Sequence, residues 1–216
     1  MNTDKKLSTR TEYVWCSGVR DHTHAYLLHP LSKWLPPQQL SNSLRVLDLG
    51  CGNGWLSRWL HDLGYTVIGV DPSPSGIEQA RLNHPSIRFE CLNPDQSILL
   101  QLKAHPFDIV VSTEVFEHCY SPSTLALTAY AALRPGGIFI CSTPCHGYVK
   151  NLILAATAKL DSHFTTLWEG GHIKFFSRRT LTKLLELAGF RYESFQGAGR
   201  FPGLWKSMLL QVQKSN

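Results

Sequence analysis

The sequence predicts an α/β fold in which helices cover both faces of a doubly wound, mostly parallel sheet. Three observations support this prediction. Apolar segments rich in β-branched residues alternate along the chain with segments of helical spacing. The apolar segments are nearly continuous, which is typical of parallel strands buried on both faces. A glycine-rich loop joins the first predicted strand to a helix, as in many α/β ligand-binding domains.

Size and composition indicate a single globular domain over residues 1–216, because 43% of the residues are hydrophobic and 17% are charged. The formal net charge of +5 would suit an anionic partner, but the basic residues are scattered, so charge alone does not support nucleic-acid binding. The cysteines form no CxxC pair and residues 1–13 lack an apolar signal-peptide core, so we expect a reduced, cytoplasmic protein. The longest apolar runs are too short to span a bilayer, so any membrane contact would be peripheral.

The predicted elements fall into three parts of the chain. A lead segment, 1–43, contains a helical pattern at 23–35 and a turn-rich linker at 36–43. A core, 44–145, contains alternating elements, with strands at 45–50, 66–71, 87–93, 107–113 and 138–144 and helices at 54–64, 73–83 and 121–137. The last part, 146–216, contains an amphipathic helix at 147–164 and a second helix at 178–189. Two closing strands, at 190–197 and 205–214, suit an antiparallel hairpin.

Boundary residues support several of these limits. Ser121 is suited to cap a helix whose first residue is Pro122, and the sequence Pro-Gly-Gly at 135–137 stops that helix. On the amphipathic helix, Lys150 and Lys159 are too few to require an anionic membrane surface, so we expect them on a solvated face.

The loop after the first strand lies where ligands bind in doubly wound sheets, at the carboxyl ends of the strands. Residues 46–56, VLDLGCGNGWL, have the spacing GxGxG, because Trp55 stands where a dinucleotide site would have its third glycine. Asp48 stands directly before the loop, and its carboxylate would repel a pyrophosphate and favour an ammonium or sulfonium group. The sequence therefore predicts a cationic ligand beside Gly50, Gly52 and Gly54.

Asp71 ends the second strand, 17 residues after Gly54. From that position a carboxylate can accept hydrogen bonds from both hydroxyls of a ribose. The alternative interpretation is that the glycines only make a tight turn and that Asp71 caps the following helix. Cys51 lies inside the loop with no base beside it in sequence, so we interpret it as a small filler rather than a nucleophile.

A turn of acidic residues and histidine follows the fourth strand. In TEVFEH, residues 113–118, Glu114, Glu117 and His118 have offsets of three and four and would share one face of a helical turn. Together with the distant His172, they offer oxygen and nitrogen ligands for Mg²⁺, Mn²⁺ or Zn²⁺. Two alternatives stay open, because His118 can act as a general base without a metal, or all these residues can be structural.

Four segments occur in the same order as the motifs of class I S-adenosylmethionine-dependent methyltransferases, and residues 44–145 resemble that family. The segments are VLDLGCGNG, VIGVDPS, FDIVVSTEVFEH and LRPGGIFICSTP. The resemblance implies a Rossmann-like, seven-stranded, mostly parallel sheet with an antiparallel last strand. It also implies S-adenosylmethionine as cofactor and S-adenosylhomocysteine as product.

The same resemblance implies a set of cofactor-binding residues. The glycines would approach the methionine part, Asp71 would hold the ribose, and Thr113 would lie near the sulfonium. The family often has an acidic residue at the adenine amino group, whereas this sequence has Asn93, with Asp95 two residues later. The expected cofactor-binding residues are Asp48, Gly50, Cys51, Gly52, Asn53, Gly54, Asp71, Pro72, Asn93 and Thr113.

The ExxEH turn and the segments at 147–164 and 170–190 resemble the ubiquinone-biosynthesis O-methyltransferases, which methylate a phenolic hydroxyl on a polyprenylated ring. The resemblance implies a small-molecule acceptor and a metal held by Glu114, Glu117 and His118. Glu117 and His118 are our candidate catalytic residues. Residues 151–160, NLILAATAKL, would flank a lipid-like substrate or touch a membrane. The sequence departs from those enzymes in the lead helix, where Ser32 and Lys33 replace an arginine.

Two other functions remain open. A similar ExxEH turn with a distant histidine occurs in small-RNA 3′-terminal 2′-O-methyltransferases, and that function would need Phe175 and Phe176 to line an RNA groove. A regulatory protein that binds the cofactor without turnover would keep the glycines and Asp71. The sequence does not indicate the oligomeric state.

Overall fold

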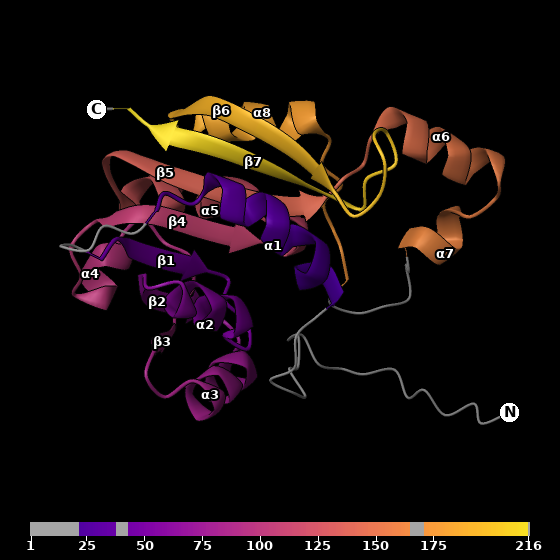
Figure 1. Ribbon diagram of the computed structural model, residues 1–216. Coiled ribbons are helices and arrows are strands. Elements are labelled where there is room, and N and C mark those ends of the chain that lie inside the picture. The colour runs from indigo at the N-terminus through magenta and orange to yellow at the C-terminus, as the bar shows by residue number, and fades with distance from the viewer. Residues whose placement is uncertain (1–21, 38–42, 165–170, 216) are drawn as a thin grey trace, which may run out of the picture.

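A seven-stranded sheet runs through the centre of the computed structural model, which describes residues 22–37, 43–164 and 171–215 (Figure 1). The strand order in this described part is β3-β2-β1-β4-β5-β7-β6. Strands β1 to β5 are parallel, and β7 is antiparallel to both of its neighbours. The bounds are β1 Arg45–Leu49, β2 Thr66–Asp71, β3 Arg88–Cys91, β4 Phe107–Thr113, β5 Leu133–Pro144, β6 Phe190–Ala198 and β7 Ser207–Lys214. The predicted fold class is confirmed.

Helices cover both faces of the sheet. Neighbouring residues of a strand point to opposite faces, so Val46 and Leu47 belong to different hydrophobic clusters. Leu47 packs with residues of α5 and α8, and Val46 packs with residues of α1, α2 and α3. The helices are α1 His22–Trp34, α2 Trp55–Asp62, α3 Pro74–Asn83, α4 Ile98–Leu102, α5 Pro122–Ala132, α6 Tyr148–Ala156, α7 Leu160–Phe164 and α8 Arg178–Leu187, with a 3₁₀ turn η1 at Phe116–His118.

Two predicted helices differ from the structure, and one observed helix was not predicted. The helix predicted at 121–137 ends at Ala132, because Leu133 already pairs with Phe107 as the first residue of β5. The helix predicted at 147–164 is divided into α6 and α7, with Ala158 in the left-handed region at φ 52°. The short helix α4 was not predicted, since five residues give no clear period.

Capping differs between two helices. Ser121 is the N-cap residue of α5, as predicted, but its hydroxyl contacts the hydroxyls of Ser123 and Thr124 and makes no cap bond to the backbone. In α8, Ser177 and Thr180 form a reciprocal capping box, in which each hydroxyl accepts a hydrogen bond from the other residue's backbone N–H.

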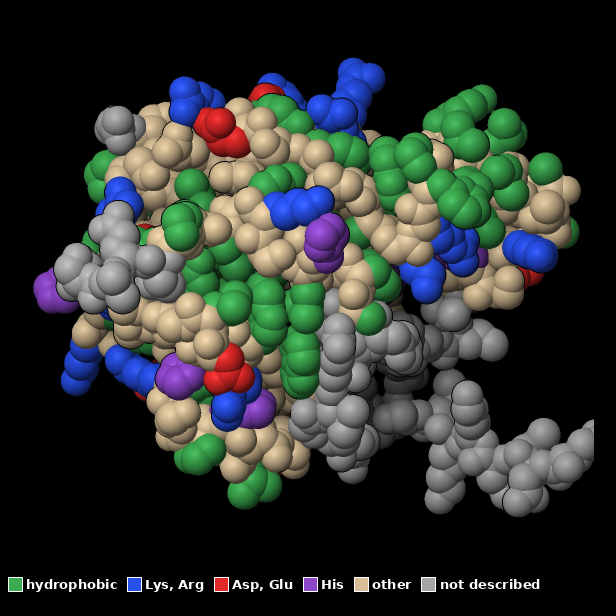
Figure 2. Space-filling model, in the orientation of Figure 1, with side chains coloured by type: hydrophobic (Ala, Val, Ile, Leu, Met, Phe, Trp, Pro, Cys, Tyr) green, Lys and Arg blue, Asp and Glu red, His purple; other side chains and the backbone are tan. Residues whose placement is uncertain are grey.

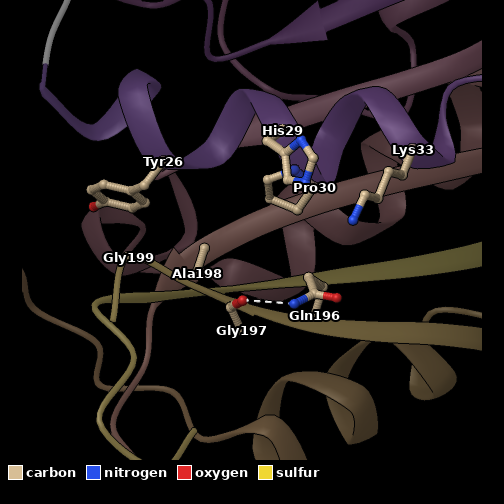
Figure 3. A pocket seen from close by; sticks show the side chains of 8 residues that line it. All are labelled: Tyr26, His29, Pro30, Lys33, Gln196, Gly197, Ala198 and Gly199. Atoms are coloured by element: carbon tan, nitrogen blue, oxygen red, sulfur yellow. Dashed lines mark hydrogen bonds between the residues drawn. The ribbon is translucent and has the colours of Figure 1, made fainter. Parts of the chain in front are cut away.

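Helix α1 packs across the closing strands, where its contacts are with β6 and β7. A cavity lies between α1 and β6, and Lys33 points toward it from the helix (Figure 3). The cavity is lined by Tyr26, His29, Pro30, Lys33, Gln196, Gly197, Ala198 and Gly199. Lys33 therefore lines a cavity, whereas Ser32 is exposed and donates to the His29 carbonyl at 2.9 Å.

The prediction of a solvated lysine face is wrong for Lys150 on α6 and confirmed for Lys159, which is exposed after that helix. Four large apolar side chains are exposed on α6, and Figure 2 shows apolar side chains gathered over this part of the molecule: Tyr148, Val149, Leu152 and Ile153. Lys150 is instead buried, because its ammonium turns inward to donate to the Cys145 carbonyl at 3.0 Å. Among the helices in the described ranges, none is both long and apolar enough to cross a membrane.

Candidate active site

The glycine loop between β1 and α2 is anchored by its own backbone. The N–H groups of Gly50 and Cys51 both donate to the Val70 carbonyl in β2, at 2.7 and 3.0 Å. Gly50 has φ +86°, and a methyl group placed on it would overlap with the Val115 side chain in the turn after β4. Only glycine fits this position without strain. The overlap with Val115 also means that the loop lies directly against the turn that carries the acidic residues.

Asp71 joins the loop to the end of β2. Its carboxylate accepts hydrogen bonds from the N–H groups of Gly52 at 2.9 Å and Ser73 at 2.8 Å. Burial raises the pKa of Asp71, although these two hydrogen bonds oppose the rise. Ser73, not Asp71, caps α3, because the Ser73 hydroxyl accepts from the Gly76 N–H at 3.2 Å. The capping alternative for Asp71 therefore fails, and its carboxylate faces the loop.

Asp48 lies beneath the loop with its side chain almost completely buried. The Ser57 hydroxyl of α2 donates to one carboxylate oxygen of Asp48 at 2.6 Å, which ties β1 to the first turn of α2. Burial raises the pKa of Asp48 to about 7, against the opposing effect of the Ser57 hydrogen bond. Burial also raises the pKa of the Cys51 thiol, so this cysteine is a neutral filler, as its sequence context indicated.

The other expected cofactor-binding residues lie around the same strand ends. Asn53 is buried, and its side-chain carbonyl oxygen accepts from the Trp55 N–H at 3.3 Å. Pro72 is exposed directly after Asp71. Asn93 is also exposed, one residue after Leu92, whose N–H donates to the Asp71 carbonyl at 3.2 Å. Thr113, the last residue of β4, is half-buried. The structure thus brings these residues to one edge of the sheet, and their cofactor contacts remain predictions.

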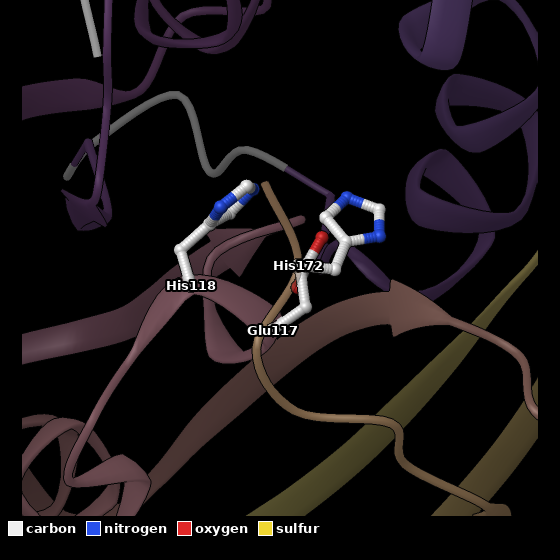
Figure 4. A group of neighbouring side chains, drawn as sticks. All are labelled: Glu117, His118 and His172. Carbon is white, nitrogen blue, oxygen red and sulfur yellow. The ribbon is translucent and has the colours of Figure 1, made fainter. Parts of the chain in front are cut away.

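Glu117, His118 and His172 form a cluster in which one ligand atom from each residue lies within 4.8 Å of the others (Figure 4). The N–H groups of Ile173 and Lys174 donate to the Glu117 carbonyl at 2.8 and 3.0 Å, which holds His172 beside the η1 turn. The imidazole rings of His118 and His172 have centroids 5.0 Å apart. The distant histidine predicted from the sequence is therefore part of the cluster.

Glu117 has an environment that suits a cation. Its side chain is only 1% exposed. One carboxylate oxygen, Oε2, accepts from the Thr143 hydroxyl at 2.9 Å. The other, Oε1, has no hydrogen-bond partner within the part of the chain that the structure describes. Burial raises the pKa of Glu117, and the nearby Glu114 carboxylate raises it further. Burial lowers the pKa of His172 to about 4, so its imidazole is neutral at physiological pH. A cation would compensate this incompletely paired carboxylate, and neutral imidazoles are metal ligands.

Glu114 lies outside this cluster of three. It precedes the η1 turn and has φ 54°, so it does not continue the helical turn on which the shared-face prediction depended. Its carboxylate accepts from the Ser142 hydroxyl at 2.7 Å and from the Ser207 hydroxyl at 2.9 Å. The Ser207 hydroxyl also lies 3.2 Å from the Tyr26 hydroxyl. Glu114 therefore connects β5, β7 and α1.

The residues that complete the site come mostly from the end of β5. Ser142 and Thr143 orient Glu114 and Glu117, respectively, and both hydroxyl residues are buried. Sequence reasoning missed them, although a signal was present: two hydroxyl residues end the apolar strand IFICSTP. Polar side chains at the carboxyl end of a buried strand face the ligand crevice of a doubly wound sheet.

A family model described as a methyltransferase domain matches residues 19–194. The chain belongs to the methyltransferase-domain family. A ubiquinone biosynthesis O-methyltransferase of Methylobacterium sp. strain 4-46 is 38% identical over 180 residues, which cover 80% of this chain and 70% of that protein. The enzyme of the same name from Dinoroseobacter shibae is 34% identical over 151 residues, which cover 68% of this chain and 59% of that protein. The chain thus spans about three fifths of the length of several curated relatives that it matches.

Solved structures share the fold of this methyltransferase domain. An S-adenosylmethionine-dependent methyltransferase from Mesorhizobium loti has a TM-score of 0.66 at 22% identity, covering 86% of this chain and 96% of that one. The magnesium protoporphyrin IX methyltransferase of Synechocystis PCC 6803, solved with S-adenosylhomocysteine, has a TM-score of 0.65 at 19% identity, covering 88% of this chain and 82% of that one. The seven-stranded sheet with an antiparallel β7 is thus the fold of methyltransferases.

Proposed function

We propose that this methyltransferase domain transfers the methyl group of S-adenosylmethionine to a hydroxyl oxygen of a small aromatic acceptor. One observation carries the proposal: the glycine loop lies against Val115, two residues before Glu117 of the acidic and histidine cluster. A cofactor on the loop and an acceptor at the cluster would therefore be neighbours. Methyl transfer needs this arrangement, because much of its acceleration comes from holding the two reacting atoms close and aligned.

Each part of the site has a role in this reaction. Asp71 would accept hydrogen bonds from the ribose hydroxyls, and the glycines would let the cofactor approach the loop backbone. The bond between sulfur and the methyl carbon breaks as a bond between that carbon and the acceptor oxygen forms, which leaves S-adenosylhomocysteine. The acceptor hydroxyl must lose its proton, and His118, a member of the cluster, would take it as general base.

Glu117, His118 and His172 are the residues that would hold a divalent ion, because the unpartnered Glu117 oxygen and the two imidazoles converge. A bound Mg²⁺, Mn²⁺ or Zn²⁺ would lower the pKa of the acceptor hydroxyl. Without an ion, the same residues supply a general base, His118, and a buried carboxylate beside it.

The relatives support a phenolic acceptor, since those at 34% and 38% identity are named ubiquinone biosynthesis O-methyltransferases. The exposed apolar side chains of α6 support a lipid-like acceptor or peripheral contact with a membrane surface. The RNA alternative is weaker, because Phe176 is buried against Phe116 and does not line a surface groove.

Activity with a catechol tests the proposal. The protein is incubated with methyl-labelled S-adenosylmethionine and 4-methylcatechol, with added Mn²⁺ or with a chelator, and the labelled ether is measured by chromatography. We expect transfer by the wild type and at least a tenfold loss in Glu117→Ala. Glu186→Ala, which removes an exposed carboxylate on α8, serves as the matched control.

Transfer at equal rates by Glu117→Ala and the wild type would contradict the assignment of the cluster. Binding of S-adenosylhomocysteine without transfer to a catechol or a series of larger phenols would favour the non-catalytic alternative. Transfer to RNA instead of phenols would favour the RNA alternative. In that case, the affinity for RNA should fall steeply as the salt concentration rises.

A further inference from the structure

A second group of polar side chains lies next to the acidic and histidine cluster and has no assigned role. It follows β5, the strand that supplies Ser142 and Thr143. His146 is 8% exposed and Lys150, in the first turn of α6, is 9% exposed. Lysine is rarely buried to this extent unless it has a partner for its charge.

The His146 imidazole is enclosed by other rings. Its centroid lies 5.8 Å from Phe164 in a stacked arrangement, 5.1 Å from Phe175 and 5.8 Å from His163. Neither of its ring nitrogens has a hydrogen-bond partner among the residues that the structure describes. Its backbone N–H donates to the Phe176 carbonyl at 3.0 Å, which attaches this loop to the segment that carries His172. The aromatic enclosure therefore borders the proposed acceptor site.

The Lys150 ammonium has few hydrogen-bond partners in the part of the chain that the structure describes. The Cys145 carbonyl, at 3.0 Å, is its one hydrogen-bond acceptor within the described ranges, although an ammonium has three donors. Burial lowers the pKa of Lys150, and the nearby Arg200 charge lowers it further. Burial also lowers the pKa of His146 to about 4, so its imidazole is neutral, and the Lys150 charge adds to this effect. The Glu114 carboxylate, which already accepts two hydroxyl donors, is the acidic group nearby.

Space is open at Gly147, the residue that follows His146. A methyl group added to Gly147, between His146 and Lys150 in sequence, would meet no atom of the described residues within 4 Å. Phe175, whose ring contacts His146, is 49% exposed, so one wall of the enclosure is accessible. Phe175 therefore offers an exposed aromatic surface to a planar ring.

We propose that Lys150, Arg200 and His146 form an anion-binding subsite that takes a carboxylate substituent of an aromatic acceptor, with Phe175 as the wall for its ring. This inference rests on the proposed O-methyltransferase function and names the acceptor class: hydroxylated aromatic acids. A single negative charge fits better than a phosphate dianion, because the Glu114 and Glu117 carboxylates already lie in the same region.

A matched pair of ligands tests the subsite directly. 3,4-Dihydroxybenzoate and 4-methylcatechol share the diphenol ring and differ in the carboxylate. Their affinities are measured by calorimetry on the full chain saturated with S-adenosylhomocysteine, in Mn²⁺ and in chelator. We expect the wild type to bind the carboxylate ligand at least about tenfold more tightly, the ratio that one charge-assisted hydrogen bond supplies. In Lys150→Met that ratio should fall to within about threefold of unity.

Three further variants make the test specific. Lys150→Arg keeps the charge and should retain most of the wild-type ratio, and Arg200→Gln should reduce it. Lys159→Met removes an exposed lysine of the connection between α6 and α7 and should retain the wild-type ratio. Thermal melting of each variant identifies any that fail to fold. If Lys150→Met does not fold, Arg200→Gln is the decisive variant.

The outcomes separate the subsite from the proposed function. Equal affinity of the wild type for the two ligands, or binding of neither, overturns the subsite. An unchanged ratio in folded Lys150→Met also overturns it. If the ratio behaves as expected but neither ligand is methylated when S-adenosylmethionine is supplied, the subsite stands and the assignment of O-methyl transfer to catechols fails.

Discussion

Replacement of Glu117 by glutamine should stabilise the metal-free protein. Glu117 is 1% exposed, its Oε1 atom has no hydrogen-bond partner in the described part of the chain, and the Glu114 carboxylate lies nearby. The glutamine side chain would retain the shape of glutamate and an oxygen that accepts from Thr143, but it would carry no charge. A residue kept for function at the expense of stability should respond in this way.

The magnitude follows from the buried charge, because the glutamine amide would also lack a partner at the Oε1 position among the described residues but would be neutral. An unsatisfied buried polar group costs about 1–3 kcal/mol and more when it is charged, and we take the difference between the charged and the neutral group to be of the same size. For a chain of this size, 1 kcal/mol shifts Tm by roughly 2–4 °C. At pH 8 in chelator, Glu117→Gln should therefore raise Tm by roughly 2–12 °C.

The effect should depend on pH with a definite sign. Burial raises the folded-state pKa of Glu117 above its unfolded value, so the wild type loses stability as pH rises through the folded pKa. The advantage of Glu117→Gln should therefore be small near pH 4.5 and larger at pH 8. Differential scanning fluorimetry with chelator at both pH values measures this, with Glu186→Gln on the exposed face of α8 as control.

Metal addition completes the experiment. Excess Mn²⁺ should raise the Tm of the wild type but not that of Glu117→Gln, because binding to the folded state alone stabilises it. The reasoning is refuted if Glu117→Gln melts at or below the wild type at pH 8 in chelator. An advantage that is the same at both pH values would also refute it.

Two other substitutions test the loop and the core. Gly50→Ala should destabilise the protein by at least about 1–2 kcal/mol, since Gly50 has φ +86° and a methyl group there would overlap with Val115; a wild-type urea unfolding midpoint would contradict this. Leu181→Ala removes a side chain that is 0% exposed and should cost about 2–5 kcal/mol, whereas Leu187→Ala on the same helix removes one that is 73% exposed and should change stability by less than about 0.5 kcal/mol. Equal urea midpoints for the two leucine variants would contradict the assignment of the α8 core face.

The sequence predicted the sheet well because parallel strands buried on both faces must be apolar along their whole length. The glycine loop was also predictable, since positive φ at Gly50 and Gly54 restricts both positions to glycine. The position of Asp71 at a strand end placed it beside the loop, and its hydrogen bond from Gly52 confirms that placement.

The remaining features depend on contacts between distant segments. The direction of Glu114 is determined by hydroxyls 28 and 93 residues away, on Ser142 and Ser207. The burial of Lys150 depends on the Cys145 carbonyl and on how α6 packs, whereas an isolated amphipathic pattern places lysine in solvent. At the break between α6 and α7, the backbone of Ala158 has a left-handed conformation. No local sequence signal predicts this conformation.

Binding of S-adenosylhomocysteine tests the central claim most directly. Calorimetry compares the wild type with Asp71→Ala and with Asp62→Ala, which removes an exposed carboxylate paired with Arg58. Asp71 is expected to accept charge-assisted hydrogen bonds from ribose hydroxyls, each worth about 1.5–3 kcal/mol, so its loss should weaken binding at least about tenfold. Asp62→Ala should bind as the wild type does. No binding by the wild type, or unchanged affinity in a folded Asp71→Ala, would contradict the account.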